Sequence, residues 1–194
     1  KRVRTLYIGG GTPTTLSTPQ MQRLMDAICA NFDLTDLIEY TVEGGRPDTL
    51  DLAKLQTIRN LGCDRMSINP QTMNDEILSL IGRRHTSAQT VEAFHAARAA
   101  GFDGINMDLI AGLPNDTRES FASSLRQVLS LDPTNVTVHT LALKKGAELF
   151  FSRTRLPSAE EVAAMLEDAE NSLRAAGYKP YYLYRQKYMS GSFE

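Results

Sequence analysis

The stretch YIGGGTPTTL, from Tyr7 to Leu16, contains the residues whose types and spacing point most directly to ligand chemistry. Three consecutive glycines, Gly9–Gly11, follow a strand-like run and precede Pro13. Because glycine allows the backbone to approach a ligand closely, exposed N–H and C=O groups there suit a molecule with both an ammonium and a carboxylate, such as an amino acid head group. The stretch lacks the Gly-Lys-Ser/Thr ending of a P-loop, and Thr14 stands where the dinucleotide fingerprint has its last glycine, so the expected ligand is not a pyrophosphate.

Polar or glycine-rich residues follow every predicted strand at the same end. They are Gly9–Thr12, Glu43, Asn69 with Gln71, Asp108, His139 with Thr140, and Arg185 with Gln186. In a (β/α) barrel the carboxyl ends of all strands meet around one mouth, whereas in an open sheet only strands beside a switch point share a site. The pattern therefore favours a closed or part-closed barrel over an open doubly wound sheet.

Two carboxylates stand out in this set. Asp108 lies in a strand that is apolar on both sides, where an unpaired carboxylate is costly, so a functional role is favoured. Glu43 precedes Gly44 and Gly45 and thus places a carboxylate beside open backbone, although a solvated strand end explains it equally well. Gln71 follows a proline and fits either a site or a turn.

Other polar residues have plain structural explanations. The run IGRRHT contains Arg83 and Arg84 and fits a solvated loop better than an anion clamp. His95 and His139 lack partners at metal-ligand spacing, which indicates packing or capping. Cys29 lies one helical turn after a methionine and is expected to be a small core residue.

Strands and helices alternate along the chain. The predicted strands are Val3–Ile8, Glu39–Glu43, Arg65–Asn69, Gly104–Ile110 and Val136–Leu143. Capping boxes at Ser17/Gln20 and Ser158/Glu161 mark the starts of two of the intervening helices, the second running to about Ala176. This alternation predicts a parallel sheet with outer helices.

The composition limits the class of protein. The chain has 194 residues, 42% of them hydrophobic, and a net charge of −2, which indicates one globular domain with a small-molecule partner and no nucleic acid. No apolar run is long enough to cross a bilayer, so no membrane partner is expected. Two widely separated cysteines fit reduced thiols and a cytoplasmic location.

Five motifs taken in order resemble one known enzyme family. YIGGGTPTTL, YTVEGGRPD, RMSINPQTMN, LIGRRHT and INMDLIAGLP together resemble the oxygen-independent coproporphyrinogen III oxidase (coproporphyrinogen dehydrogenase) family of radical S-adenosylmethionine enzymes. The segments SINPQTMN and YLYRQKYMSGSFE are most similar to the bacterial paralogue branch of that family. The resemblance implies a partial TIM-type (β/α) barrel of the radical SAM type, with parallel strands and outer helices.

The resemblance also implies which residues bind the cofactor. The glycine loop would receive the methionine part of S-adenosylmethionine, with Gly9 in the loop, Gly10 in contact with the cluster-bound molecule and Glu43 holding its ribose hydroxyls. The matching positions around a second S-adenosylmethionine are Gly11, Thr12, Gln71, Arg83, Asp108 and Ala142.

The family's iron–sulfur ligands have no counterpart in this sequence. Members hold a [4Fe–4S] cluster with a Cys-x3-Cys-x2-Cys loop after the first barrel strand, whereas Cys29 and Cys63 form no such loop. The chain opens on what matches the second strand and stops inside a motif at SGSFE. We therefore expect residues 1–194 to be an excised part of the core barrel, without the first strand, the cluster loop and the C-terminal domain, and inactive alone.

For the intact protein, the resemblance implies reductive cleavage of S-adenosylmethionine to a 5′-deoxyadenosyl radical. The radical would take a hydrogen from a propionate side chain of a tetrapyrrole, and loss of carbon dioxide and an electron would leave a vinyl group. A reduced electron donor is implied as a partner, and Arg84, Arg185 and Lys187 are candidates to meet propionates. Two alternatives stay open: a heme carrier on the same fold, and a cluster-free barrel enzyme acting on a small anion.

Overall fold

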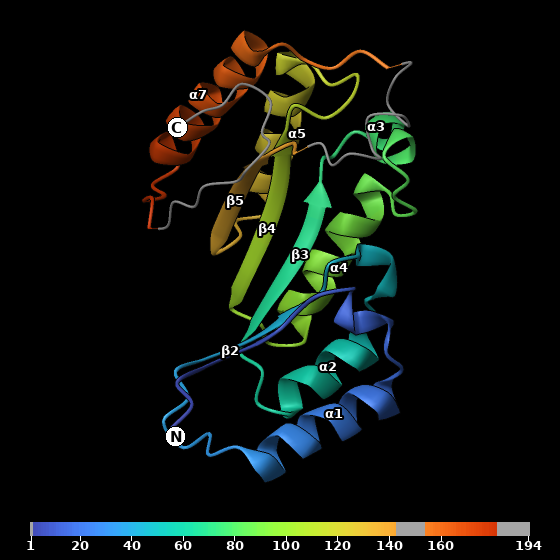
Figure 1. The fold of residues 1–194 in the computed structure, drawn as a ribbon, viewed down its shortest axis with the longest axis vertical. Helices are drawn as coiled ribbons and strands as arrows, with labels where there is room; N and C mark the ends of the chain where they lie inside the picture. Colours follow the sequence, from blue (N-terminus) through green and yellow to red (C-terminus); the bar gives the residue numbers. More distant parts are fainter. Residues whose placement is uncertain (1, 143–153, 182–194) are drawn as a thin grey trace. The chain divides into compact units, whose positions relative to one another are not determined.

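The computed structural model describes residues 2–142 and 154–181 (Figure 1). Its strands are β1 (Thr5–Ile8), β2 (Glu39–Glu43), β3 (Arg65–Gln71), β4 (Gly104–Ala111) and β5 (Asn135–Thr140). Its helices are α1 (Thr18–Asn31), α2 (Leu52–Asn60), α3 (Asp75–Leu80), α4 (Ser87–Ala99), α5 (Arg118–Ser130) and α7 (Ala159–Ala175), with 3-10 turns η1 (Pro13–Thr15) and η2 (Pro47–Thr49). None of the helices in these ranges has both the length and the apolar character needed to cross a membrane.

The strands form one sheet in the order β1-β2-β3-β4-β5. Strand β2 pairs in parallel with both β1 and β3. Each strand therefore lies beside the next strand in the chain, as in the successive units of a (β/α) barrel, whereas a doubly wound sheet reverses its order at a switch point. The strand order agrees with the predicted partial barrel.

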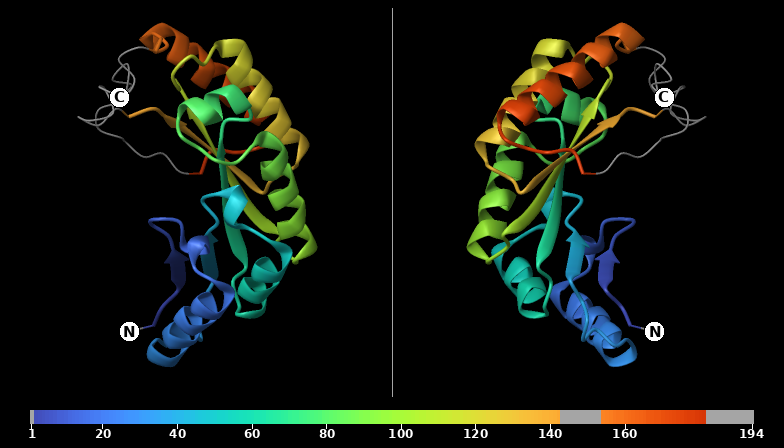
Figure 2. Two further views of the ribbon diagram at one scale, coloured as in Figure 1. Left: turned by 90° about the vertical axis from the view of Figure 1, so that its right-hand side faces the viewer. Right: turned by 90° about the vertical axis from the view of Figure 1, so that its left-hand side faces the viewer.

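The chain divides into two compact units. The first comprises Lys1–Pro70, Ala88–Met107 and Pro133–Asn135. In this unit helices α1 and α2 lie side by side (Figures 1 and 2). Its buried apolar side chains include Met21, Met25, Val42, Leu55, Ile58, Met66, Ile68, Phe94 and Ile105.

The register of the first unit separates an apolar face of the sheet from a polar one. Val42 lies opposite Met66, and both side chains are fully or almost fully buried. The next pair, Glu43 and Ser67, points to the opposite face because successive side chains alternate along a strand. The polar face therefore holds the predicted carboxylate together with the polar residues of β3.

The second unit comprises Gln71–Ser87, Asp108–Asp132 and Val136–Glu194. Helices α5 and α7 lie side by side in it (Figure 2). The predicted capping box starts α7, since Ser158 N–H donates to Glu161 Oε2 at 2.8 Å and Glu161 N–H donates to Ser158 Oγ at 3.2 Å. The bidentate pair of Arg118 with Asp168, at 2.6 and 2.7 Å, joins the exposed sides of the two helices.

The prediction that Cys29 is a core residue is wrong. Met21 and Met25 are fully buried in α1, but Cys29 is exposed and Phe32 is 57% exposed. Each four-residue step along an α-helix turns the side chain by about 40° away from the starting direction. Cys29, two such steps after Met21, has therefore left the narrow strip of α1 that is buried.

Candidate functional site

The three glycines of the first loop differ in what surrounds them. A Cβ added to Gly9 would lie 2.2 Å from Tyr7 Cε1 and 2.8 Å from Glu43 Oε2, so any larger residue would force these two side chains to move. Gly10 has a φ of +117°, which L side chains rarely adopt. A Cβ on Gly10 or Gly11 would meet nothing within 4 Å, so open space lies over both residues. The loop therefore presents backbone to open space at Gly10 and Gly11.

Glu43 is tied to this loop by direct hydrogen bonds. Its Oε2 accepts from Gly10 N–H at 3.2 Å and from the hydroxyl of Tyr7 at 3.3 Å, while Oε1 accepts from Asn69 Nδ2 at 3.4 Å. An ionised carboxylate has about four acceptor positions. These protein donors account for three of them, so the half-buried carboxylate retains capacity for a further hydroxyl donor.

A row of polar side chains fixes the orientation of Asn69. The hydroxyl of Ser67 donates to Asn69 Oδ1 at 2.6 Å, and this directs the amide NH₂ of Asn69 toward Glu43. Asn106 Nδ2 in turn donates to Ser67 Oγ at 3.1 Å, and Asn135 Nδ2 donates to Asn106 Oδ1. The row extends from β2 to β5 within the first unit and ends on the predicted carboxylate.

Thr12 closes the glycine loop. It has a φ of 62°, uncommon for a residue with a branched side chain, and its carbonyl accepts hydrogen bonds from both the N–H and the hydroxyl of Thr15. Its side chain faces the backbone of Gly45, since a Cβ built on Gly45 would lie 3.4 Å from both Oγ1 and Cγ2 of Thr12. The glycine loop and the loop after Glu43 are thus in contact.

The remaining predicted residues lie in the second unit. Gln71 ends β3 with a φ of 69° and is buried. Arg83 is half-buried after α3, where its N–H donates to Leu78 O at 2.9 Å, and Ala142 forms a half-buried bridge beyond β5. Asp108 lies on β4. The structure therefore brings Gly9, Gly10, Gly11, Thr12 and Glu43 together in one unit, while the other four predicted residues belong to the other unit.

Asp108 has a neighbour that the sequence interpretation missed. His139 Nε2 lies 3.7 Å from Asp108 Oδ2, and both side chains are largely buried at 25% and 15% exposure. The spacing of His139 in the sequence favours packing or capping, whereas the structure places it beside a predicted site residue. The sequence does contain a sign of this proximity, because Asp108 and His139 both belong to the set of polar side chains at strand exits.

Arg185, Gln186 and Lys187 lie outside the described residues. Arg84, the other cation proposed to meet propionates, is exposed.

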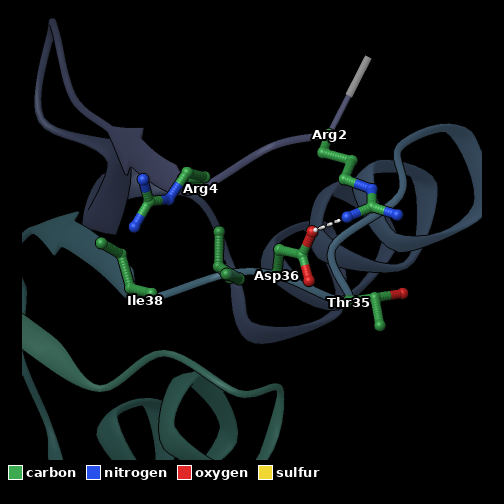
Figure 3. Close-up of a pocket in the computed structure, with 6 residues that line it drawn as sticks. Arg2, Arg4, Thr35, Asp36 and Ile38 are labelled. Carbon is green, nitrogen blue, oxygen red and sulfur yellow. Dashed lines mark ion pairs between the residues drawn. The ribbon is translucent and has the colours of Figure 1, made fainter.

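A separate hollow of about 620 Å³ lies near the start of the chain (Figure 3). Its lining is Arg2, Arg4, Thr35, Asp36, Leu37 and Ile38, and it contains none of the predicted site residues. Arg2 forms a 3.1 Å ion pair with Asp36, but their side chains are 77% and 44% exposed. Exposed pairs of this kind contribute little, so this hollow is not a second candidate for the site.

Comparison with known proteins identifies the family. The model of the Radical SAM superfamily matches residues 1–128, and the chain belongs to that superfamily. It is 43% identical over its whole length to the oxygen-independent coproporphyrinogen-III oxidase-like protein HemZ of Bacillus subtilis, and 36% identical over 92% of its length to the heme chaperone HemW of the same organism. The chain spans only 39% and 48% of these two proteins.

A solved structure gives the same result. The coproporphyrinogen III oxidase HemN of Escherichia coli, described as a radical SAM enzyme, matches 92% of this chain and 42% of its own with a TM-score of 0.84 and 32% identity. The predicted family and the predicted partial (β/α) barrel are therefore confirmed. These relatives give no support to the alternative of a cluster-free barrel enzyme acting on a small anion.

S-adenosylmethionine and a [4Fe–4S] cluster are the cofactors of this family. The first unit fits S-adenosylmethionine, because it offers a carboxylate with acceptor capacity beside open space over two glycines. It does not fit the cluster. Cys63 is buried, its Sγ lies 3.2 Å from Tyr40 O and 3.1 Å from Arg65 O, and burial raises the pKa of this thiol to about 12, which disfavours the thiolate that iron requires.

Cys29, the other of the two cysteines in the sequence, is exposed near the C-terminal end of α1. The described ranges contain no group of three or more His, Cys, Asp or Glu side chains placed to hold a metal ion. The residues that the structure describes therefore fit a nucleoside cofactor and do not fit the cluster.

Proposed function

We propose that the first unit binds S-adenosylmethionine through the glycine loop and Glu43. The remaining acceptor position of the Glu43 carboxylate takes a ribose hydroxyl, and the backbone at Gly10 and Gly11 lines the space for the amino acid part. The observation that carries the proposal is the hydrogen bond from Gly10 N–H to Glu43 Oε2 at 3.2 Å beside that open space. Hydrogen bonds between hydroxyls and a carboxylate are worth about 1.5–3 kcal/mol each.

We further propose that the protein acts in the oxygen-independent oxidative decarboxylation of coproporphyrinogen III to protoporphyrinogen IX, a step of heme biosynthesis. Similarity to HemZ and to the HemN structure supports this activity. When bound with the family's cluster, S-adenosylmethionine supplies the one-electron chemistry that removes a hydrogen atom from an unactivated C–H bond. A tetrapyrrole substrate and a reduced electron donor are the partners that this reaction requires.

For the second unit, we propose that Gln71, Arg83, Asp108 and Ala142 contribute to a second S-adenosylmethionine site. Two features of that unit support a ligand role. Gln71 holds a left-handed backbone conformation at φ 69°, which costs energy in a residue other than glycine. Asp108 keeps a partly exposed carboxylate between the buried Met107 and Leu109.

Binding of S-adenosylmethionine tests the first proposal directly. Isothermal titration of the chain is expected to give a measurable Kd that Glu43→Gln weakens by about tenfold, because the amide replaces one acceptor oxygen and the negative charge is lost. Glu39→Gln is the matched control, since Glu39 lies on the same strand and its nearest cation is Arg65 at 3.9 Å. Equal Kd values for the two variants would exclude Glu43 as the ribose ligand.

A heme-handling function is the second candidate, because the chain is also 36% identical to HemW, a heme chaperone. The two functions differ in their products. The native protein carrying this chain, purified anaerobically and given reductant, S-adenosylmethionine and coproporphyrinogen III, is expected to form protoporphyrinogen. Absence of decarboxylation together with stoichiometric uptake of added heme would favour the chaperone.

A further inference from the structure

Lys54, in the first turn of α2, contacts the turns that follow the two loops of the proposed site. Its ammonium donates to Thr14 O at 2.7 Å and to Thr49 O at 3.1 Å. Thr14 lies in η1, which follows the glycine loop, and Thr49 lies in η2, which follows Glu43 and its two glycines. The side chain of Lys54 therefore joins the turn after the glycine loop to the turn after Glu43.

The hydroxyls of Thr14 and Thr49 reinforce this junction. Thr14 is fully buried, and its Oγ lies 3.0 Å from Gly44 O and 2.6 Å from Thr49 Oγ. Thr49 Oγ donates to Arg46 O at 2.7 Å. Gly44 directly follows Glu43, so the contact from Thr14 ties the turn after the glycine loop to the residue next to the carboxylate.

Helix α2 holds Lys54 rigidly. Asp51 caps the helix by accepting from Lys54 N–H at 2.7 Å, and Leu55 and Ile58 anchor it in the core with no exposed surface. The partners of the ammonium are two main-chain carbonyls, and no carboxylate in the described ranges forms an ion pair with it. The contacts of Lys54 therefore hold the backbones of η1 and η2 at a set distance from each other. They do not serve to neutralise the charge of a carboxylate.

We propose that Lys54 is a positioning residue for the cofactor, acting with Thr14 to hold the glycine loop at hydrogen-bonding distance from Glu43. The inference rests on the proposed S-adenosylmethionine site. Without the ammonium, η1 and η2 lose their shared donor, and Gly10 N–H is no longer held against the carboxylate. Affinity then falls although neither Lys54 nor Thr14 touches the ligand.

The test is titration of the full chain with S-adenosylmethionine. Lys54→Met is expected to weaken binding by about tenfold, because charge-assisted hydrogen bonds are lost, whereas Lys54→Arg keeps donors for both carbonyls and stays within about threefold of the parent. Lys179→Met, which removes an exposed ammonium in the second unit, is the charge-matched control and is expected to bind as the parent does. Parental affinity in Lys54→Met would overturn the inference.

Amide spectroscopy provides a readout that does not depend on the ligand. In ¹H–¹⁵N spectra, Lys54→Met and Thr14→Val are both expected to shift the Gly10 and Gly45 resonances, while amides of buried β3 residues such as Ile68 keep their positions. Unmoved Gly10 and Gly45 resonances in both folded variants would overturn the inference even if the parent chain binds nothing. A parent chain that fails to bind, with these shifts present, would instead count against the proposed function alone.

Discussion

Glu43 in the first unit and Asp108 in the second come from the same sequence pattern, a carboxylate at the exit of a strand, yet their surroundings differ. Glu43 accepts three hydrogen bonds, from a backbone N–H, a hydroxyl and an amide. Asp108 lies beside the imidazole of His139, whose Nε2 is 3.7 Å from Asp108 Oδ2. The first carboxylate is oriented by neutral donors, and the second lies beside an imidazole ring.

The difference shows that a strand-exit pattern locates a carboxylate without defining its chemistry. Neutral donors that are fixed in place orient an acceptor for a ligand at no cost in reorganisation. Perturbing the donors around Glu43 should therefore alter ligand affinity, whereas the buried carboxyl of Asp116 in the second unit should reveal itself through the pH dependence of stability.

The largest effect is expected from Gly9→Ala. The new methyl group would lie 2.2 Å from Tyr7 Cε1 and 2.8 Å from Glu43 Oε2, so both side chains must move. Overpacking of this kind costs about 1–3 kcal/mol, and displacement of Glu43 should also reduce affinity for S-adenosylmethionine. Urea unfolding and ligand titration measure the two effects.

Gly11→Ala is the control for this substitution, because a methyl group there meets nothing within 4 Å and the residue has no positive φ. It should change stability by much less than Gly9→Ala. Equal stability of the two variants would mean that the contact between Gly9, Tyr7 and Glu43 does not constrain the loop.

Local patterns in the sequence predict most of the fold. Strand β2 has the predicted bounds, β4 extends the predicted strand by one residue to Ala111, and Ser158 caps α7 as expected. These features depend on alternation and capping chemistry within a few residues. The predicted fifth strand, Val136–Leu143, is less accurate, since β5 is Asn135–Thr140 and Leu143 lies outside the described residues.

The contacts that define the site were less predictable. The sequence pointed to Gly10 and Glu43 but gave no sign that Tyr7, 60% exposed on β1, donates to Glu43. It also gave no role to Lys54. These contacts depend on the register between strands and on the path of two turns, and neither can be read from the periodicity of a single segment.

A smaller effect is expected from Asn69→Ala, which tests the donors of Glu43 more finely. The change removes the 3.4 Å hydrogen bond to Oε1 and the acceptor of Ser67. Loss of one such bond costs about 0.5–1.5 kcal/mol, which corresponds to a roughly two- to tenfold weaker Kd for S-adenosylmethionine if the orientation of Glu43 controls binding.

Asn106→Ala is the comparison for this variant, because Asn106 contacts Ser67 and not Glu43. It should weaken binding less than Asn69→Ala does. An equal or larger loss of affinity in Asn106→Ala would mean that the row of polar side chains acts as a whole and that Asn69 has no special place in it.

The smallest effect is expected from Asp116→Asn in the second unit, and it appears only as a dependence on pH. Asp116 is fully buried, and burial raises the pKa of its carboxyl above the ordinary 3.8, an effect that hydrogen bonds from Ser120 and Thr117 partly offset. The folded state thus holds the proton more tightly than the unfolded state. The contribution of Asp116 to stability should be greatest below the ordinary carboxyl range and should be lost as pH rises through the raised pKa.

Asparagine cannot ionise, so Asp116→Asn should lack this fall in stability while keeping an acceptor for Thr117 N–H at the position of Oδ1, 3.0 Å away. Thermal unfolding midpoints between about pH 3 and pH 7 measure the difference. Glu119→Gln, an exposed change on α5, is the control and should follow the parent curve. Parallel curves for Asp116→Asn and the parent would show that the buried carboxylate carries no ionisation penalty, and the second unit would then resemble the first in holding its carboxylates with sufficient donors.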